Sequence, residues 1–434
     1  MDSRLQDRFH ALVAGHMHTV NPAVTGLSSL PATAQPMACV KAMSRFLHNE
    51  DVTLPALIEP VQESIRTTLA QSPAAVALVA HDWCMIHYGT RNADRYQRSH
   101  KTDLGYELGS ALVIDTDEGQ PLGPMEIRLR TATATLSTRP TATANPPGHV
   151  DELLDVMNDA RSRWHLGKPL VHVIDREADS VDHYRKWSHA GHTFLVRADP
   201  DRVVKIDGRD VKLTQLTDQV ALNWQRVRDA VGQPKSLKIK GVVGTVWVAE
   251  VAVVLDRPAK KRVGEGKRID VAGVPLPLRL VVSWVLSEEG EVLAEWLLFT
   301  NAAGEFDAAT IACWYAWRWR IETYHKLLKS SGMNAECWQQ ESGEAVAKRL
   351  VVTSMACLTA WRLQEDPSEL AEEMRGVLVR LSGRQMKHRV GSTAPALLAG
   401  LEKLLAIDDL LQQYNLEEVL ALARRVLPKL FRSG

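Results

Sequence analysis

Four polar side chains recur at helical spacing near residue 320. They are a phenol, a guanidinium, a carboxylate and an ammonium: Tyr315, Arg318, Glu322 and Lys329. Their spacings of 3, 4 and 7 residues place all four within roughly 60° of one another on a helix. A carboxylate can hold a metal ion, and the two cations can grip phosphates on either side of it. The alternative is an exposed helix with ordinary ion pairs, each worth a few tenths of a kcal/mol.

Two more carboxylates follow short apolar runs elsewhere in the chain. Asp82 comes almost directly after Ala75–Ala80, and Asp175 comes directly after Leu170–Ile174. Such runs are typical of buried strands, and ligands of α/β sheets gather at strand ends. We therefore expect Asp82 and Asp175 to lie side by side at adjacent strand ends, with Glu322 closing the site from its helix.

The elements that must position these groups can be predicted from hydrophobic patterning. Buried strands are predicted over Ala75–Ala80, Leu108–Asp115, Met125–Arg130, Leu170–Ile174 and His192–Val196, and helices over Val150–Trp164, Asp307–Ser330 and Glu344–Leu363. Three strands, a helix and a further strand, with carboxylates at the ends of the first and fourth strands, is the order of a ribonuclease-H-like core.

The predicted fold class is therefore α/β, a ribonuclease-H-like catalytic core with an inserted antiparallel β-subdomain, flanked by helical N- and C-terminal regions. We expect a helical DNA-end-binding module over residues 1–72, the core over 73–199 and 301–365, the insertion over 200–300, and a helical region suited to dimerisation over 366–434. Within the insertion, the basic run Arg257–Arg268 is predicted to be a long loop between two strands.

Composition limits the protein class. The 434 residues carry 52 basic and 52 acidic side chains, and this balance argues mildly against a nucleic-acid partner unless the basic surplus is local. Five cysteines without a CxxC pair argue against a disulfide framework or a structural zinc site. The longest apolar stretch is too short to span a bilayer, and the N-terminus lacks a signal-peptide core. We therefore expect a soluble cytoplasmic protein.

The motif around Glu322 resembles the signature of DDE transposases of the insertion-sequence-four family, which includes the transposon-five transposase. The resemblance rests on Tyr315-x2-Arg318-x3-Glu322-x6-Lys329, on Trp319-Arg320-Ile321 before Glu322, and on Asp175-Arg176-Glu177-Ala178-Asp179. It spans about residues 40 to 365. Where the family often has small hydroxyl residues after its first aspartate, this chain has Trp83 and Cys84.

The resemblance implies cut-and-paste DNA transposition by two-metal phosphoryl transfer. Asp82, Asp175 and Glu322 would be the catalytic metal ligands, with two Mg²⁺ ions for which Mn²⁺ can substitute. Contacts to DNA are expected from Tyr315, Arg318, Lys329, Trp296 and Arg176. Trp296 would stack on a flipped base unless it is simply buried in a strand. Arg176 would contact the DNA backbone or pair with the carboxylate cluster.

The implied partners are the terminal inverted repeats of the transposon and target DNA, bound by a homodimer. Lys41 and Arg45 are weaker candidates for contacts to the DNA ends. Two other functions stay open: a related nuclease without strand transfer, and an inactive or domesticated DNA-binding relative that acts as an inhibitor.

Overall fold

The computed structural model describes most of the chain. The described residues are 6, 9, 36–88, 94–97, 103–140, 145, 148–164, 167–227, 236–239, 242–263, 267–331, 333–386 and 391–427. The expected N-terminal module covers residues 1–72. Of its first 35 residues, only Gln6 and Phe9 are described, whereas residues 36–72 are described throughout.

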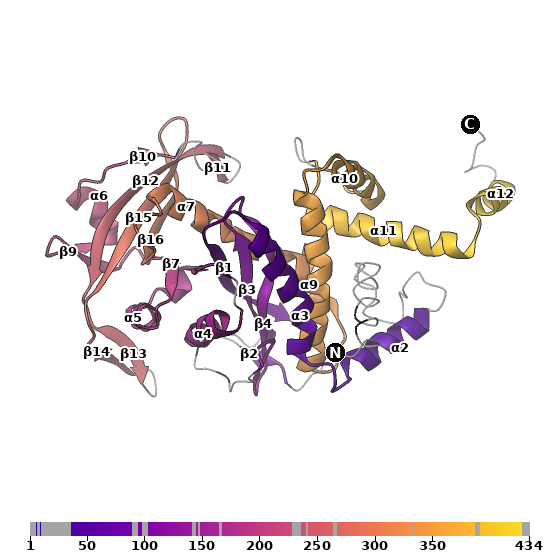
Figure 1. Ribbon diagram of the computed structural model, residues 1–434, viewed down its shortest axis with the longest axis horizontal. Coiled ribbons are helices and arrows are strands. Elements are labelled where there is room, and N and C mark those ends of the chain that lie inside the picture. The colour runs from indigo at the N-terminus through magenta and orange to yellow at the C-terminus, as the bar shows by residue number, and fades with distance from the viewer. Residues whose placement is uncertain are drawn as a thin grey trace.

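A single large sheet runs through the molecule (Figure 1). Its first part has the order β4-β3-β1-β6-β7. These strands are β1 (Ala77–His87), β3 (Leu104–Asp115), β4 (Gln120–Arg130), β6 (Leu170–Ile174) and β7 (Thr193–Arg197). The pairs β1–β3 and β3–β4 are antiparallel, whereas β1–β6 and β6–β7 are parallel. All five predicted strands are thus present, and β1 is much longer than its apolar run.

The segment expected as a separate β-subdomain instead continues the same sheet. From β7 the sheet proceeds through β16 (Val292–Thr300), β15 (Leu276–Leu286), β12 (Val242–Leu255), β8 (Val203–Ile206) and β9 (Arg209–Lys212). Each of these pairs is antiparallel, including the β16–β7 junction. Hydrogen bonds across that junction join the insertion to the strands around Asp175.

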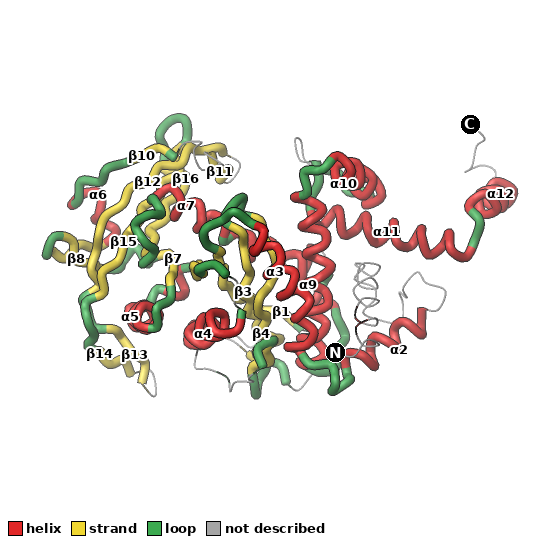
Figure 2. Tube along the Cα trace, in the orientation of Figure 1, coloured by secondary structure: helices red, strands yellow, loops and turns green. Residues whose placement is uncertain are grey.

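The predicted loop Arg257–Arg268 is wrong. It forms most of a two-stranded ribbon, β13 (Ala259–Val263) with β14 (Lys267–Val271), which stands apart from the main sheet (Figure 2). The clustered charges in this run led to the loop prediction, because charged runs are typical of solvated segments. Four short strands complete the sheet edges: β2 (Tyr96–Gln97), β5 (Thr135–Ser137), β10 (Gln225–Arg226) and β11 (Ser236–Ile239).

Helices cover both faces of the sheet. On one face α3 (Leu54–Gln71) and α9 (Gly343–Glu365) pack against β4, and on the other α5 (Val181–His189) packs against β7. Successive residues of β6 consequently belong to different cores, Val173 to the first and Ile174 to the second. A sheet buried on both faces explains why its strands are nearly continuous apolar runs.

The other helical elements connect these layers or form the ends of the chain. They are α2 (Pro36–Leu47), η2 (His149–Glu152), α4 (Leu153–Arg163), η3 (Arg176–Ala178), η4 (Leu213–Gln215), α6 (Leu216–Gln219), α7 (Ala308–Trp317), α8 (Trp319–Lys326), a π-helical turn (Leu327–Ser331), η7 (Ala335–Cys337), α10 (Glu369–Ser382), α11 (Ala394–Gln413) and α12 (Leu416–Val426). Figure 1 shows α11 extending away from α9 to α12, which has no buried residue. Among the described residues, no helix is long and apolar enough to cross a membrane.

Two buried histidines, His172 within β6 and His192 directly before β7, lead to a prediction about acid stability. Burial and the charge of His192 lower the pKa of His172 to about 3, and burial and Arg161 lower that of His192 to about 4. An unfolded histidine titrates near 6.5, so the folded state binds fewer protons below that pH. The contribution of the two neutral histidines to stability should be fully present above about pH 6.5. It should decrease as the pH drops towards their pKa values in the folded state.

We expect the free energy of unfolding, measured in urea, to fall by up to about 2 kcal/mol per histidine between pH 7.5 and pH 5. His172→Asn should flatten this dependence, whereas His189→Asn, at an exposed position, should not. Identical pH profiles for wild type and His172→Asn would contradict the prediction.

Candidate active site

Asp82 lies inside strand β1 rather than at its end, which corrects the expectation from the sequence. Strand β1 pairs with β3 as far as His87, whereas its parallel pairing with β6 stops at His81 opposite Ile174. Asp82 is therefore the first residue of β1 beyond the last rung shared with β6. Asp175 occupies the corresponding place after β6, with an extended backbone (φ −79°, ψ −173°). The two carboxylates thus leave adjacent parallel strands at the same level.

The acidic motif after β6 separates into different roles. The Asp175 carboxylate caps η3, because its Oδ1 accepts a hydrogen bond from the backbone N–H of Glu177 at 2.9 Å. Asp179 is 3.0 Å from Arg202 and accepts a hydrogen bond from the Tyr184 hydroxyl. Glu177 pairs with His149 at 3.0 Å. The Glu177 and Asp179 carboxylates thus each engage a cation, and the motif does not act as one cluster.

The helix predicted over residues 307–330 is broken at Arg318. Asp307 caps α7 by accepting a hydrogen bond from the Thr310 N–H at 2.8 Å, and α8 begins at Trp319. The segment then ends in the π-helical turn that carries Lys329. An evenly wound 3.6-residue helix is therefore the wrong geometry for the four-residue stripe. The stripe is also partly buried, since Tyr315 is 1% exposed and Arg318 is 6% exposed.

Arg318 stands between two of the three carboxylates. Its Nη2 lies 2.7 Å from Glu322 Oε1, and its Nη1 lies 3.9 Å from Asp82 Oδ2. His325, one turn beyond Glu322, approaches Asp82 Oδ2 at 3.9 Å with Nδ1 and contacts the Ser110 hydroxyl at 3.2 Å with Nε2. Asp82 and Ser110 are paired across β1 and β3, so both point to the face that α8 covers.

The electrostatics show that the three carboxylates share one environment. Burial raises the pKa of Asp82 to about 6. The Arg318 guanidinium opposes this shift, while the negative charges of Asp175 and Glu322 add to it. Burial disfavours the charge of Arg318 as well, yet Tyr315 and the carboxylates together raise its pKa. The site thus concentrates negative charge around one buried cation.

The donor chemistry of this cluster fits a hard divalent cation, since all three side chains offer carboxylate oxygens. In the part of the chain that the structure describes, no group of three or more His, Cys, Asp or Glu side chains is arranged to hold a metal ion. Arg318 supplies the counter-charge instead, at the position between Asp82 and Glu322.

The expected DNA contacts differ in accessibility. Trp296 is 6% exposed and packs its ring against Tyr315 at 5.8 Å, so both are buried among neighbouring side chains. Lys329 is half-buried and lies 3.3 Å from Glu336. Arg176 is exposed in η3 and lines a cavity of about 550 Å³ together with Arg202, Arg257 and Lys260. Within the described ranges no carboxylate forms an ion pair with Arg176. The expected alternative, that Arg176 pairs with the carboxylate cluster, is therefore not seen.

Sequence reasoning gave no role to two histidines near the carboxylates. His325 sits at i+3 from Glu322, and that helical spacing could have identified it as a neighbour of the carboxylate. His149 lies far from the other site residues in sequence, and no local pattern indicates it. Lys41 and Arg45 are exposed on α2 and distant in sequence from the carboxylates.

Comparisons with known proteins give limited information. No protein-family model matches the chain, and no curated protein sequence matches it. A similar solved structure is a piggyBac transposase, determined by cryo-EM in a synaptic complex with hairpin DNA. It shares 10% sequence identity with this chain at a TM-score of 0.41, and the match covers 99% of this chain and 77% of that one. The function of the chain must therefore be argued from its own residues.

The position of Arg318 predicts a specific energetic coupling. Arg318→Met leaves the Asp82 carboxylate, which is only 17% exposed, without its counter-charge, so the free energy of unfolding should fall by about 3 kcal/mol at neutral pH. The double variant Arg318→Met/Asp82→Asn should lose less than Arg318→Met alone. As a control, Arg66→Met removes a solvated ion pair with Glu59 and should cost less than about 1 kcal/mol. Additive losses in the double-mutant cycle would contradict the coupling.

Proposed function

We propose that this chain is a DNA transposase that cuts and joins DNA by metal-dependent phosphoryl transfer. The observation that carries the proposal is the gathering of Asp82, Asp175 and Glu322, from two adjacent strands and one helix, around Arg318. The strand order β4-β3-β1-β6-β7, with its antiparallel and parallel pairs, supports a ribonuclease-H-like core as the scaffold. The family signature in the sequence supports the reaction class.

Asp82, Asp175 and Glu322 would hold two Mg²⁺ ions, or Mn²⁺ in their place. When bound, these ions supply activation of the attacking water or 3′-hydroxyl and stabilisation of the leaving oxygen. Glu322 has the freedom to serve as a ligand because its side chain is about one third exposed. Asp82 and Asp175 are held by the sheet, so they define the fixed side of the site.

The cations of the same segment would bind the DNA backbone. Arg318 can exchange its bond to Glu322 for a bidentate bond to a phosphate, which frees the Glu322 carboxylate. Lys329 pairs with Glu336 in the free protein. It can likewise exchange this ion pair for a bond to a phosphate. In this scheme the binding of a phosphate by Arg318 releases the Glu322 carboxylate. A DNA end is therefore bound before it is cut. Two protein copies would hold two transposon ends, cut them through a hairpin intermediate and join them to target DNA.

A second function keeps the same fold without catalysis. The Arg318–Glu322 pair at 2.7 Å occupies the Glu322 carboxylate, and a DNA-binding relative that inhibits transposition would keep this pair closed. A nuclease without strand transfer would use the same carboxylates. Products of the reaction on DNA ends separate these functions.

Glu322→Gln should retain binding to a duplex that carries the gene's own flanking ends and should lose cleavage by 100-fold or more, because the amide is a poor metal ligand. Binding is measured by fluorescence anisotropy and cleavage on denaturing gels with Mg²⁺ or Mn²⁺. Glu372→Gln, exposed on α10, is the control and should cut normally. Cleavage by Glu322→Gln at the wild-type rate would sink the proposal, whereas hairpin or joined wild-type products would exclude a simple nuclease.

Lys329→Ala should weaken binding to the same ends, because one phosphate contact is lost. The plot of log affinity against log salt should become shallower by about one unit. Lys403→Ala, exposed on α11, removes an equal charge elsewhere and should leave the slope unchanged. Equal slopes for wild type and Lys329→Ala would show that Lys329 does not contact a phosphate.

A further inference from the structure

His149 lies behind the candidate active site, on the opposite face of the sheet. Side chains alternate along β1, so Asp82 points towards α8 and the next residue, Trp83, points towards η2. The imidazole of His149 stacks on the Trp83 indole with ring centres 4.4 Å apart and an angle of 25° between the planes. Trp83 itself packs closely over Gly109, where a β-carbon would lie 3.0 Å from the indole.

The same imidazole bridges two carboxylates. Its Nδ1 lies 3.4 Å from Glu107 Oε2, and its Nε2 lies 3.0 Å from Glu177 Oε2. Burial alone would lower the pKa of His149, but its hydrogen bonds to Glu107 and Glu177 raise the pKa to about 9. The ring is therefore a cation at neutral pH, and both of its nitrogens donate.

These contacts lead to the two strand carboxylates of the proposed site. Trp83 is the residue after Asp82 in β1. Glu177 donates its backbone N–H to Asp175 Oδ1 at 2.9 Å. One side chain thus connects a neighbour of Asp82 with a neighbour of Asp175, across the edge at which β1 and β6 stop pairing.

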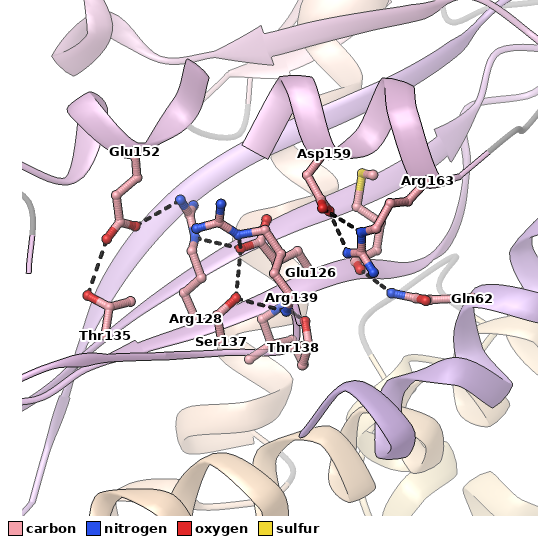
Figure 3. Close-up of polar contacts among 12 residues, drawn as sticks. Gln62, Glu126, Arg128, Thr135, Ser137, Thr138, Arg139, Glu152, Asp159 and Arg163 are labelled. Carbon is pink, nitrogen blue, oxygen red and sulfur yellow. Dashed lines mark hydrogen bonds and ion pairs between the residues drawn. The ribbon is translucent and has the colours of Figure 1, made fainter. Parts of the chain in front are cut away.

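The short helix η2, which carries His149, is held to strand β4 by buried ion pairs. Glu152, at the other end of η2, forms a buried ion pair with Arg128 of β4 at 3.0 Å and accepts a hydrogen bond from the Thr135 hydroxyl (Figure 3). Glu126 and Arg139, paired at 2.8 Å, extend this buried network along β4 (Figure 3). Breaking such buried ion pairs is costly, although Arg128 Nε and Nη2 and Arg139 Nη2 have no hydrogen-bond partner among the described residues. A shift of η2 would have to break these ion pairs.

We propose that His149 is a positioning residue that fixes the separation of the Asp82 and Asp175 carboxylates by bracing Trp83 and Glu177 from the far side of the sheet. The inference rests on the proposed function, because it concerns the same metal-binding carboxylates. Supporting partners of metal ligands commonly change metal affinity or activity by 10- to 100-fold when they are removed. A merely structural ion pair would change stability and leave the metal dependence unaltered.

The test compares wild type, His149→Ala and Glu177→Gln in the full chain bound to duplex DNA ends. Glu177→Gln is the second variant because Glu177 is about half exposed, so its loss should not impair folding even if His149→Ala does. Mn²⁺ binding is measured by electron paramagnetic resonance of the free ion, and cleavage is followed against Mn²⁺ concentration. We expect the half-saturating Mn²⁺ concentration to rise about 10-fold or more in both variants, with unchanged affinity for DNA.

His183 provides a matched control. It contacts Asp151 of the same η2 at 3.0 Å and stacks on Trp187, but it reaches neither carboxylate neighbour. His183→Ala should therefore leave the Mn²⁺ dependence at the wild-type value. If wild type binds Mn²⁺ and cuts while Glu177→Gln behaves like wild type, the positioning role is overturned and the proposed function stands. If wild type neither binds Mn²⁺ nor cuts, both fall together.

Discussion

The burial of the Asp82 carboxylate beside one guanidinium is the constraint on which the site depends. A lone buried carboxylate is costly, and Asp175 and Glu322 increase the cost because they carry the same charge. Arg318 compensates it from the break between α7 and α8. Because the guanidinium must reach both Asp82 and Glu322, the approach of α8 to β1 is set by this ion-pair geometry as well as by apolar packing.

The sheet supplies the fixed half of the site through a change of partner. Strand β1 pairs in parallel with β6 up to His81 and in antiparallel with β3 well beyond it. Asp82 is therefore held by hydrogen bonds on one side and open on the other, where Asp175 follows β6. An antiparallel neighbour on that side would cover the carboxylates. The insertion joins the sheet at β7, one strand farther away, and leaves this gap free.

Support on the opposite face complements this open edge. A strand end that lacks a hydrogen-bonded neighbour on one side is its least restrained part. The stack of His149 on Trp83 and the His149–Glu177 pair add restraint at that place, and the ion network of Glu152 and Arg128 carries it into β4. The buried polar groups of β4 thus restrain the strand ends of the site from the opposite face, although none of them faces the carboxylates.

The sequence by itself indicated the apolar strands of the main sheet and put forward Asp82, Asp175 and Glu322 as the candidate carboxylates. Leu170–Ile174 was predicted residue for residue, because an apolar run between turn residues depends only on local pattern. Tertiary structure decided the rest. It broke the helix at Arg318, and it merged the insertion with the core sheet through β16 and β7. It also brought His149 to Glu177, because contacts between residues distant in sequence arise only when the sheet and its helices pack.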